Sequence, residues 1–82
     1  MTVNIYVWRD PKMGIRYRII SAQGKDVKFG RGDIDSIIRT IEEFKDSDYK
    51  INPGITWDGV SMPLSNDEKS KLLRRIKEIT IK

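Results

Sequence analysis

This chain of 82 residues is rich in charged side chains, which make up 34% of it, and it contains neither cysteine nor histidine. Their absence excludes a disulfide framework, a thiolate metal site and catalysis by a histidine base. Charge is sorted along the chain: residues 1–32 hold seven Lys or Arg and two Asp or Glu, residues 33–64 hold three and seven, and residues 65–82 hold six and three. An acidic centre therefore separates two basic ends, and such local patches steer partners more than the net charge of +4 does.

Alternating apolar and polar side chains predict that the chain opens with three strands. The first strand covers residues 3–8, and a turn containing proline and glycine follows it. The second covers residues 15–21, and a hairpin turn at residues 23–24 leads to a short third strand over residues 26–29. The side chains that we expect toward the core are those of Val3, Ile5, Val7, Ile15, Tyr17, Ile19, Val27 and Phe29.

The clearest periodic signal in the chain predicts a helix over residues 34–46. Isoleucines and a phenylalanine recur at helical spacing along this segment, which gives it one apolar face. Asp33 precedes the segment and is the predicted N-cap, because its carboxylate can accept a hydrogen bond from a free amide group of the first turn.

The remaining residues predict one strand and one helix. Residues 49–57 indicate a strand that Pro53 and Gly54 interrupt. Ser65, followed three residues later by Glu68, matches the capping box that starts many helices. The second helix should extend to about residue 79, with one face lined by Leu72, Leu73, Ile76 and Ile79.

Together these elements predict an α+β fold of one domain, residues 1–82, in the order β-β-β-α-β-α. Short connections exclude parallel pairing among the first three strands, because parallel neighbours need long crossovers. We therefore expect an antiparallel sheet of three to four strands with both helices on one face. The other face should be at least partly open and should present Tyr6, Trp8, Arg16, Arg18 and Lys28.

The central predicted helix carries acidic side chains opposite its apolar face. Asp35, Glu42 and Asp46 fall in one narrow angular band, and Glu43 lies near its edge. One interpretation is a docking face, on a rigid element, for a basic protein partner. The other is an ordinary solvated helix face, since Arg39 lies in the same band and can pair with Asp35 or Glu42.

Basic side chains gather on the predicted open face of the sheet. Arg16, Arg18 and Lys28 project from it, and Arg31 lies at the end of the third strand. Cations beside aromatic rings suit a nucleic-acid platform, where phosphates take the charge and bases stack. The other interpretation is an exposed sheet face whose long cations cover apolar surface and deter edge pairing.

The residue types give no indication of catalysis. The serines have no histidine to activate them, and no spacing of Asp and Glu singles out an acid–base pair. Residues 30–32 (Gly-Arg-Gly) lack the glycine pattern of a phosphate loop. We therefore expect a non-catalytic protein with no cofactor, no metal and no catalytic residue.

The hydropathy of the chain bears on its location. No apolar run approaches the ~20 residues that cross a bilayer. The first residues lack the basic and apolar regions of a signal peptide. With the absence of cysteine, these features predict a soluble cytoplasmic protein with no membrane partner.

The last third of the chain resembles one class of small proteins. Residues 55–59 (Ile-Thr-Trp-Asp-Gly), followed by residues 63–69 (Pro-Leu-Ser-Asn-Asp-Glu-Lys) and an apolar-periodic helix, resemble the tail of small immunity proteins of bacterial toxin systems. This resemblance implies a protein that binds a cognate toxin and blocks it by occlusion, without chemistry of its own.

Two functional hypotheses follow. The first is an immunity or inhibitor protein that binds a basic toxin or effector, and its protein-binding residues are Asp35, Glu42, Glu43, Asp46 and Trp57. The alternative is a module that binds DNA or RNA, of phage or mobile-element origin, and its binding residues are Arg16, Arg18, Lys28 and Arg31.

Overall fold

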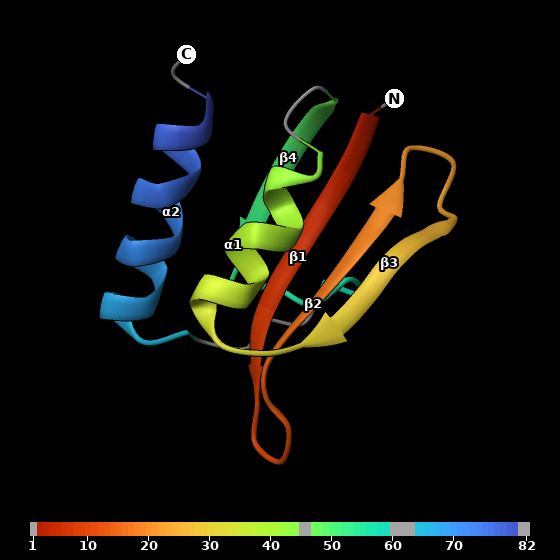
Figure 1. The fold of residues 1–82 in the computed structure, drawn as a ribbon. Helices are drawn as coiled ribbons and strands as arrows, with labels where there is room; N and C mark the ends of the chain where they lie inside the picture. The colour runs from red at the N-terminus through yellow and green to blue at the C-terminus, as the bar shows by residue number, and fades with distance from the viewer. Residues whose placement is uncertain (1, 45–46, 60–63, 81–82) are drawn as a thin grey trace.

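The computed structural model of this protein describes residues 2–44, 47–59 and 64–80, and it confirms the predicted α+β fold and element order (Figure 1). Four strands form one sheet, and two helices accompany it. The elements are β1 (Thr2–Asp10), β2 (Gly14–Ser21), β3 (Asp26–Arg31), α1 (Ile34–Glu42), β4 (Asp48–Pro53) and α2 (Asn66–Thr80).

The sheet has the strand order β3-β2-β1-β4. β1 with β2 and β2 with β3 pair antiparallel, as predicted, whereas β4 pairs parallel with β1. The sheet is therefore mostly, and not wholly, antiparallel. The reason is the helix between β3 and β4: α1 returns the chain along the sheet from one edge to the other, so β4 runs in the same direction as β3 and β1.

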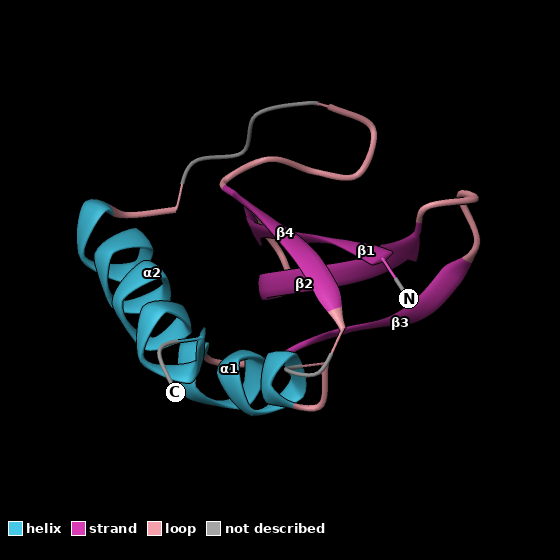
Figure 2. Ribbon diagram, turned by 90° about the horizontal axis from the view of Figure 1, so that it is seen from above, coloured by secondary structure: helices cyan, strands magenta, loops and turns pink. Residues whose placement is uncertain are grey.

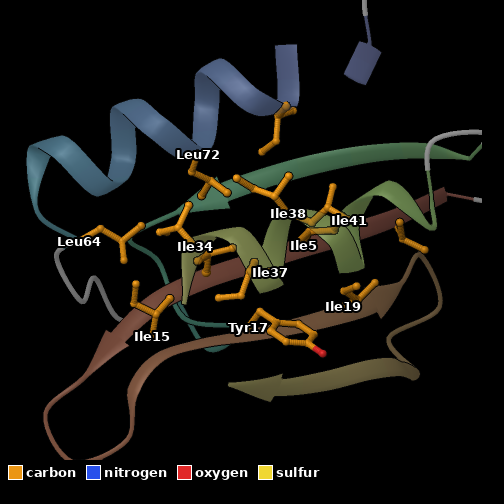
Figure 3. Close-up of a cluster of buried hydrophobic side chains, with 13 residues drawn as sticks. Ile5, Ile15, Tyr17, Ile19, Ile34, Ile37, Ile38, Ile41, Leu64 and Leu72 are labelled. Atoms are coloured by element: carbon orange, nitrogen blue, oxygen red, sulfur yellow. The ribbon is translucent and has the colours of Figure 1, made fainter. Parts of the chain in front are cut away.

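Both helices lie on one side of the sheet, and residues 54–59, which follow β4, lie on the other (Figure 2). The core forms between the sheet and the helices (Figure 3). Alternate residues of β1 and β2 enter it, which confirms the predicted period of two. The core side chains are Val3, Ile5, Val7, Ile15, Tyr17, Ile19, Ile34, Ile37, Ile38, Ile41, Leu64, Leu72 and Ile76.

The predicted helix starts are both confirmed. The Asp33 carboxylate accepts a hydrogen bond of 2.8 Å from the amide of Ser36 and so caps α1. At α2, the Glu68 amide donates to the Ser65 hydroxyl at 3.2 Å, and the Ser65 amide donates to the Glu68 carboxylate at 3.0 Å. These two reciprocal bonds are the capping box.

The helices differ from the prediction in two details. α1 ends at Glu42, before the predicted residue 46, because the amides of Glu43 and Phe44 bond to carbonyls three residues back and tighten the last turn. Leu73 is 43% exposed instead of facing the core, since its neighbour Leu72 takes the inward direction. No helix within the described ranges is long and apolar enough to span a membrane.

The side chains of Lys28 and Phe29 in β3 point opposite to the predicted directions. Lys28 lies opposite Ile19 on the helix-covered face, where its ammonium donates at 2.9 Å to Glu43, the residue that caps the end of α1. Phe29 lies opposite Arg18 on the other face and is 66% exposed. The pairing with β2, which shifts register between Ile19 and Ile20, sets this orientation, and a one-residue shift exchanges the two faces of a strand.

Candidate functional site

The sheet surface opposite the helices carries most of the basic and aromatic side chains of the strands. We name it the outer face. Cross-strand pairs assemble it, with Trp8 opposite Arg16 and Arg18 opposite Phe29. Its members from β1, β2 and β3 are Tyr6, Trp8, Arg16, Arg18, Asp26, Phe29 and Arg31.

A turn after β4 brings Trp57 onto the outer face. The Gly54 amide donates to the Val7 carbonyl at 2.6 Å, and this glycine has a φ of 75°, which L-amino acids rarely adopt. Thr56 is buried, and its hydroxyl donates to the Asp58 carboxylate. These contacts fix both sides of Trp57, so a loop residue becomes part of the sheet surface.

Two arginines stack on two tryptophans there. The guanidinium of Arg18 lies 4.3 Å from the ring centroid of Trp57, and that of Arg16 lies 5.4 Å from the centroid of Trp8. Trp8 is buried, whereas Trp57 is 49% exposed. A cation over an indole face is attracted by the ring quadrupole, so both guanidinium groups are held against the sheet.

The arginines of the outer face differ in how closely a carboxylate contacts them. Asp26 accepts two hydrogen bonds of 2.6 Å from Arg18, and this bidentate contact lowers the pKa of the Asp26 carboxyl and raises the pKa of Arg18. Arg16 lies 3.5 Å from Asp10. Arg31 is exposed and forms no ion pair with any residue that the structure describes.

Asp10 is held chiefly by the backbone. The amides of Lys12 and Met13 donate to its carboxylate at 2.8 and 3.0 Å, and these bonds lower the pKa of the Asp10 carboxyl more than Arg16 does. The contact of Asp10 with Arg16 is long, and the Arg16 side chain is 36% exposed, so Arg16 can still meet a ligand. Positive charge therefore remains on the outer face at Arg16 and Arg31.

A pocket of about 200 Å³ opens among these side chains. Buried Trp8 and exposed Phe29 and Trp57 supply aromatic surface, and charged groups supply the rest. Its lining residues are Trp8, Arg16, Tyr17, Arg18, Asp26, Phe29 and Trp57. A preformed hollow with aromatic walls and a few convergent polar groups is typical of a ligand site.

Two of the acidic residues predicted to bind a protein form ion pairs within the molecule. Asp35 lies 3.3 Å from the ammonium of Lys71 and 3.8 Å from Arg75, both on α2. Glu43 is paired with Lys28, as described above, and Glu42 is exposed. Asp46 lies outside the described residues, and Trp57 lies on the outer face, across the sheet from α1.

The four basic residues predicted to bind nucleic acid do not all lie on the same face of the sheet. Arg16, Arg18 and Arg31 share the outer face, and Lys28 lies on the opposite side of β3. The sequence did not predict Asp26 or Phe29 as site residues, and it did not predict that Trp57 would lie on the outer face. Trp57 lies in a loop without periodicity, so the sequence held no signal for its position.

A second groove, of about 300 Å³, lies where the two helices begin. Three of the four acidic side chains that line it serve the fold: Asp33 caps α1, Glu68 completes the capping box and pairs with Arg9, and Asp35 pairs with Lys71. Across the described residues there is no group of three or more acidic side chains placed to hold a metal ion. We therefore assign this groove a structural role.

The comparisons with known proteins identify no relative. No protein family, no curated protein and no solved structure matches this chain.

Proposed function

We propose that this protein is a small, non-catalytic binding module whose outer face binds single-stranded nucleic acid. The observation that carries the proposal is the pocketed outer face itself, where Arg16, Arg18 and Arg31 alternate with exposed Phe29 and Trp57. We place the protein in the cytoplasm, where such a ligand occurs.

The chemistry of this surface matches both parts of a single strand. Guanidinium groups neutralise phosphates and release their counterions, which supplies sequence-independent affinity. Exposed aromatic rings stack on bases, and every base has a face to offer when it is unpaired. In a duplex these faces are hidden, so Phe29 and Trp57 favour single strands.

The inhibitor hypothesis stays a prediction. It needs one acidic surface on α1, but Asp35 and Glu43 are engaged with basic side chains of the same molecule. A toxin would have to displace these internal partners before it gained the charge. Glu42 is exposed and forms no ion pair with the residues that the structure describes, so it is the residue whose charge reversal would test that hypothesis.

The test is fluorescence anisotropy with labelled single-stranded DNA, single-stranded RNA and duplex DNA of about 15 nucleotides. Affinity is measured between about 50 and about 200 mM salt. We expect the single strands to bind more tightly than the duplex. Their affinity should fall as salt rises, because counterions are released on binding.

Two charge reversals locate the interface. Arg31→Glu changes the outer face, and Arg74→Glu is the matched control, because Arg74 is exposed on α2 at the helix side. Arg31→Glu should weaken binding for all sequences and reduce the salt slope by about 0.7, the contribution of one phosphate on a single strand. Equal weakening by both variants would show that net charge alone attracts the strand. A failure of the wild-type protein to bind any of the three nucleic acids would overturn the proposal.

A further inference from the structure

We propose that Arg16 and Arg31 bind the terminal phosphate of a single strand, whose last nucleotide places its base on Phe29 in the pocket. This assignment rests on the proposed function and deepens it, because it gives the outer face a preference for one kind of strand end. The group that is recognised is a phosphate monoester, which a strand can carry at its 5′ or its 3′ end.

Arg16 and Arg31 lie directly opposite each other across β2 and β3. The Cβ atoms of such a pair lie about 5 Å apart, and like charges in this arrangement are destabilising. Carboxylates relieve the repulsion little. Arg31 is exposed and forms no ion pair with the described residues, and the contact of Arg16 with Asp10 is 3.5 Å long. An anion that bridges the two guanidinium groups would remove the repulsion between them.

Both guanidinium groups keep N–H donors for such an anion. Arg31 extends from the end of β3 as an exposed side chain. The guanidinium of Arg16 lies 5.4 Å from the ring centroid of Trp8, and stacking engages only its face, so N–H groups in its plane stay available. Arg18, in contrast, is held by its bidentate contact with Asp26. The phosphate position is therefore the pair of Arg16 and Arg31.

The charge of this pair matches a phosphate monoester better than a phosphate inside a strand. A phosphate inside a strand carries a single negative charge, whereas a monoester carries about 1.5 to 2 and offers three acceptor oxygens. Each guanidinium can thus donate to a different oxygen. The position also suits a strand end, because β3 ends at Arg31 and the next outer position of β1 is Asp10, whose carboxylate disfavours a further phosphate.

Phe29 lies where it can receive the base of the same nucleotide. It precedes Arg31 by two positions on β3, so both side chains lie on the outer face, about 7 Å apart. Its ring is 66% exposed and lines the pocket together with Trp57. One nucleotide spans this distance between its base and its phosphate. The base can therefore stack on Phe29 while the phosphate reaches Arg31.

The experiment compares oligothymidylates of about 15 nucleotides that carry hydroxyl groups at both ends, a 5′-phosphate or a 3′-phosphate. Each unlabelled oligomer competes with an internally labelled oligothymidylate, and fluorescence anisotropy measures the displacement. One of the two phosphorylated oligomers should bind about tenfold or more tightly than the hydroxyl oligomer, and it identifies the end that is recognised. A parallel oligouridylate series distinguishes RNA from DNA.

Arg31→Gln removes one guanidinium from the pair and should abolish the advantage of the phosphorylated oligomer. Lys50→Gln is the matched control, because Lys50 is an exposed cation of β4 that lies opposite Asn4 on the outer face. The control should weaken all three oligomers alike and keep the advantage. Thermal melting confirms that each variant is folded.

A pH series tests the charge of the recognised group without any substitution. Lowering the pH from about 7.5 to about 5.5 protonates a phosphate monoester, whose second pKa is about 6, so the advantage should shrink. The chain contains no histidine. Backbone hydrogen bonds hold the pKa of Asp10, and Arg18 holds that of Asp26, below the ordinary value, so both carboxylates stay ionised throughout.

The outcomes separate the two proposals. Equal binding of the three oligomers by the wild-type protein would overturn the terminal-phosphate assignment and leave the single-strand function standing. An advantage that survives Arg31→Gln, or that Lys50→Gln abolishes equally, would also overturn it, as would an advantage that is constant over the pH series. Binding of no oligomer would remove the proposed function and the terminal-phosphate site together.

Discussion

The two faces of the sheet differ in composition and in burial. The helix-covered face is almost entirely aliphatic, and α1 and α2 seal it with isoleucine and leucine. The outer face carries arginines, aromatic rings and carboxylate partners, and among the described residues the segment around Trp57 covers part of it. Because one face supplies the buried apolar area that folding needs, the other can keep exposed aromatic rings that add little to stability.

The largest expected effect tests this division directly. Ile37 is fully buried, so Ile37→Ala should lower the free energy of unfolding by about 2–5 kcal/mol. Phe29→Ala, on the outer face, should change it by no more than about 0.5 kcal/mol. Urea unfolding at neutral pH measures both. If Ile37→Ala leaves too little folded protein, Ile37→Val should still cost about 0.5–1.5 kcal/mol. Similar losses for the two truncations would contradict the division between the faces.

The second effect concerns binding and not stability. Trp57→Ala removes one stacking surface beside Arg18 and should weaken single-strand binding by about 5- to 150-fold. Leu73→Ala is the control, because Leu73 has similar exposure on α2. Anisotropy titrations should leave the control unchanged. A control that loses as much affinity as Trp57→Ala would place the binding surface elsewhere.

The smallest effect is the dependence of stability on acid. Hydrogen bonds from Arg18 lower the pKa of Asp26, and a hydrogen bond from Arg9 lowers that of Glu68, from ordinary values of 3.8 and 4.5. A carboxylate with a depressed folded pKa stabilises the protein above its ordinary pKa, and that contribution disappears as pH falls through the folded value.

Urea unfolding between about pH 7 and about pH 5 should therefore give constant midpoints, with a decline below about pH 4. Asp26→Asn should make the decline shallower. The core residues carry no carboxylate, so the acid response belongs to the outer face, the turn at Asp10 and the starts of the two helices. A midpoint that is flat down to about pH 2 would contradict the role of these pairs.

The sequence predicted what depends on local period and capping. Alternation identified β1 and β2 with the correct inward residues, and Asp33 and Ser65 marked the two helix starts. These features depend on neighbours within a few residues, which the sequence displays directly.

What escaped prediction depends on long-range pairing. The direction of β4 depends on the path of α1, which carries the chain from one edge of the sheet to the other. The side-chain directions of β3 depend on its register with β2. The ion pairs of Asp35 with Lys71 and Arg75 could not be predicted, because these partners lie on another helix. The pocket required residues from three strands and a loop, so neither Asp26 nor Phe29 could be grouped with Trp57 beforehand.

The parallel pairing of β4 with β1 also sets an order of assembly. β1 is an edge strand until the chain has completed β3 and α1, and such non-local pairing is slow because it must close a long loop. Trp57 follows β4, so the pocket is complete only when β4 has paired with β1. A ligand bound in the pocket would stabilise the pairing of β4 with β1 against local unfolding. Hydrogen exchange of the β4 amides would then slow as the pocket fills.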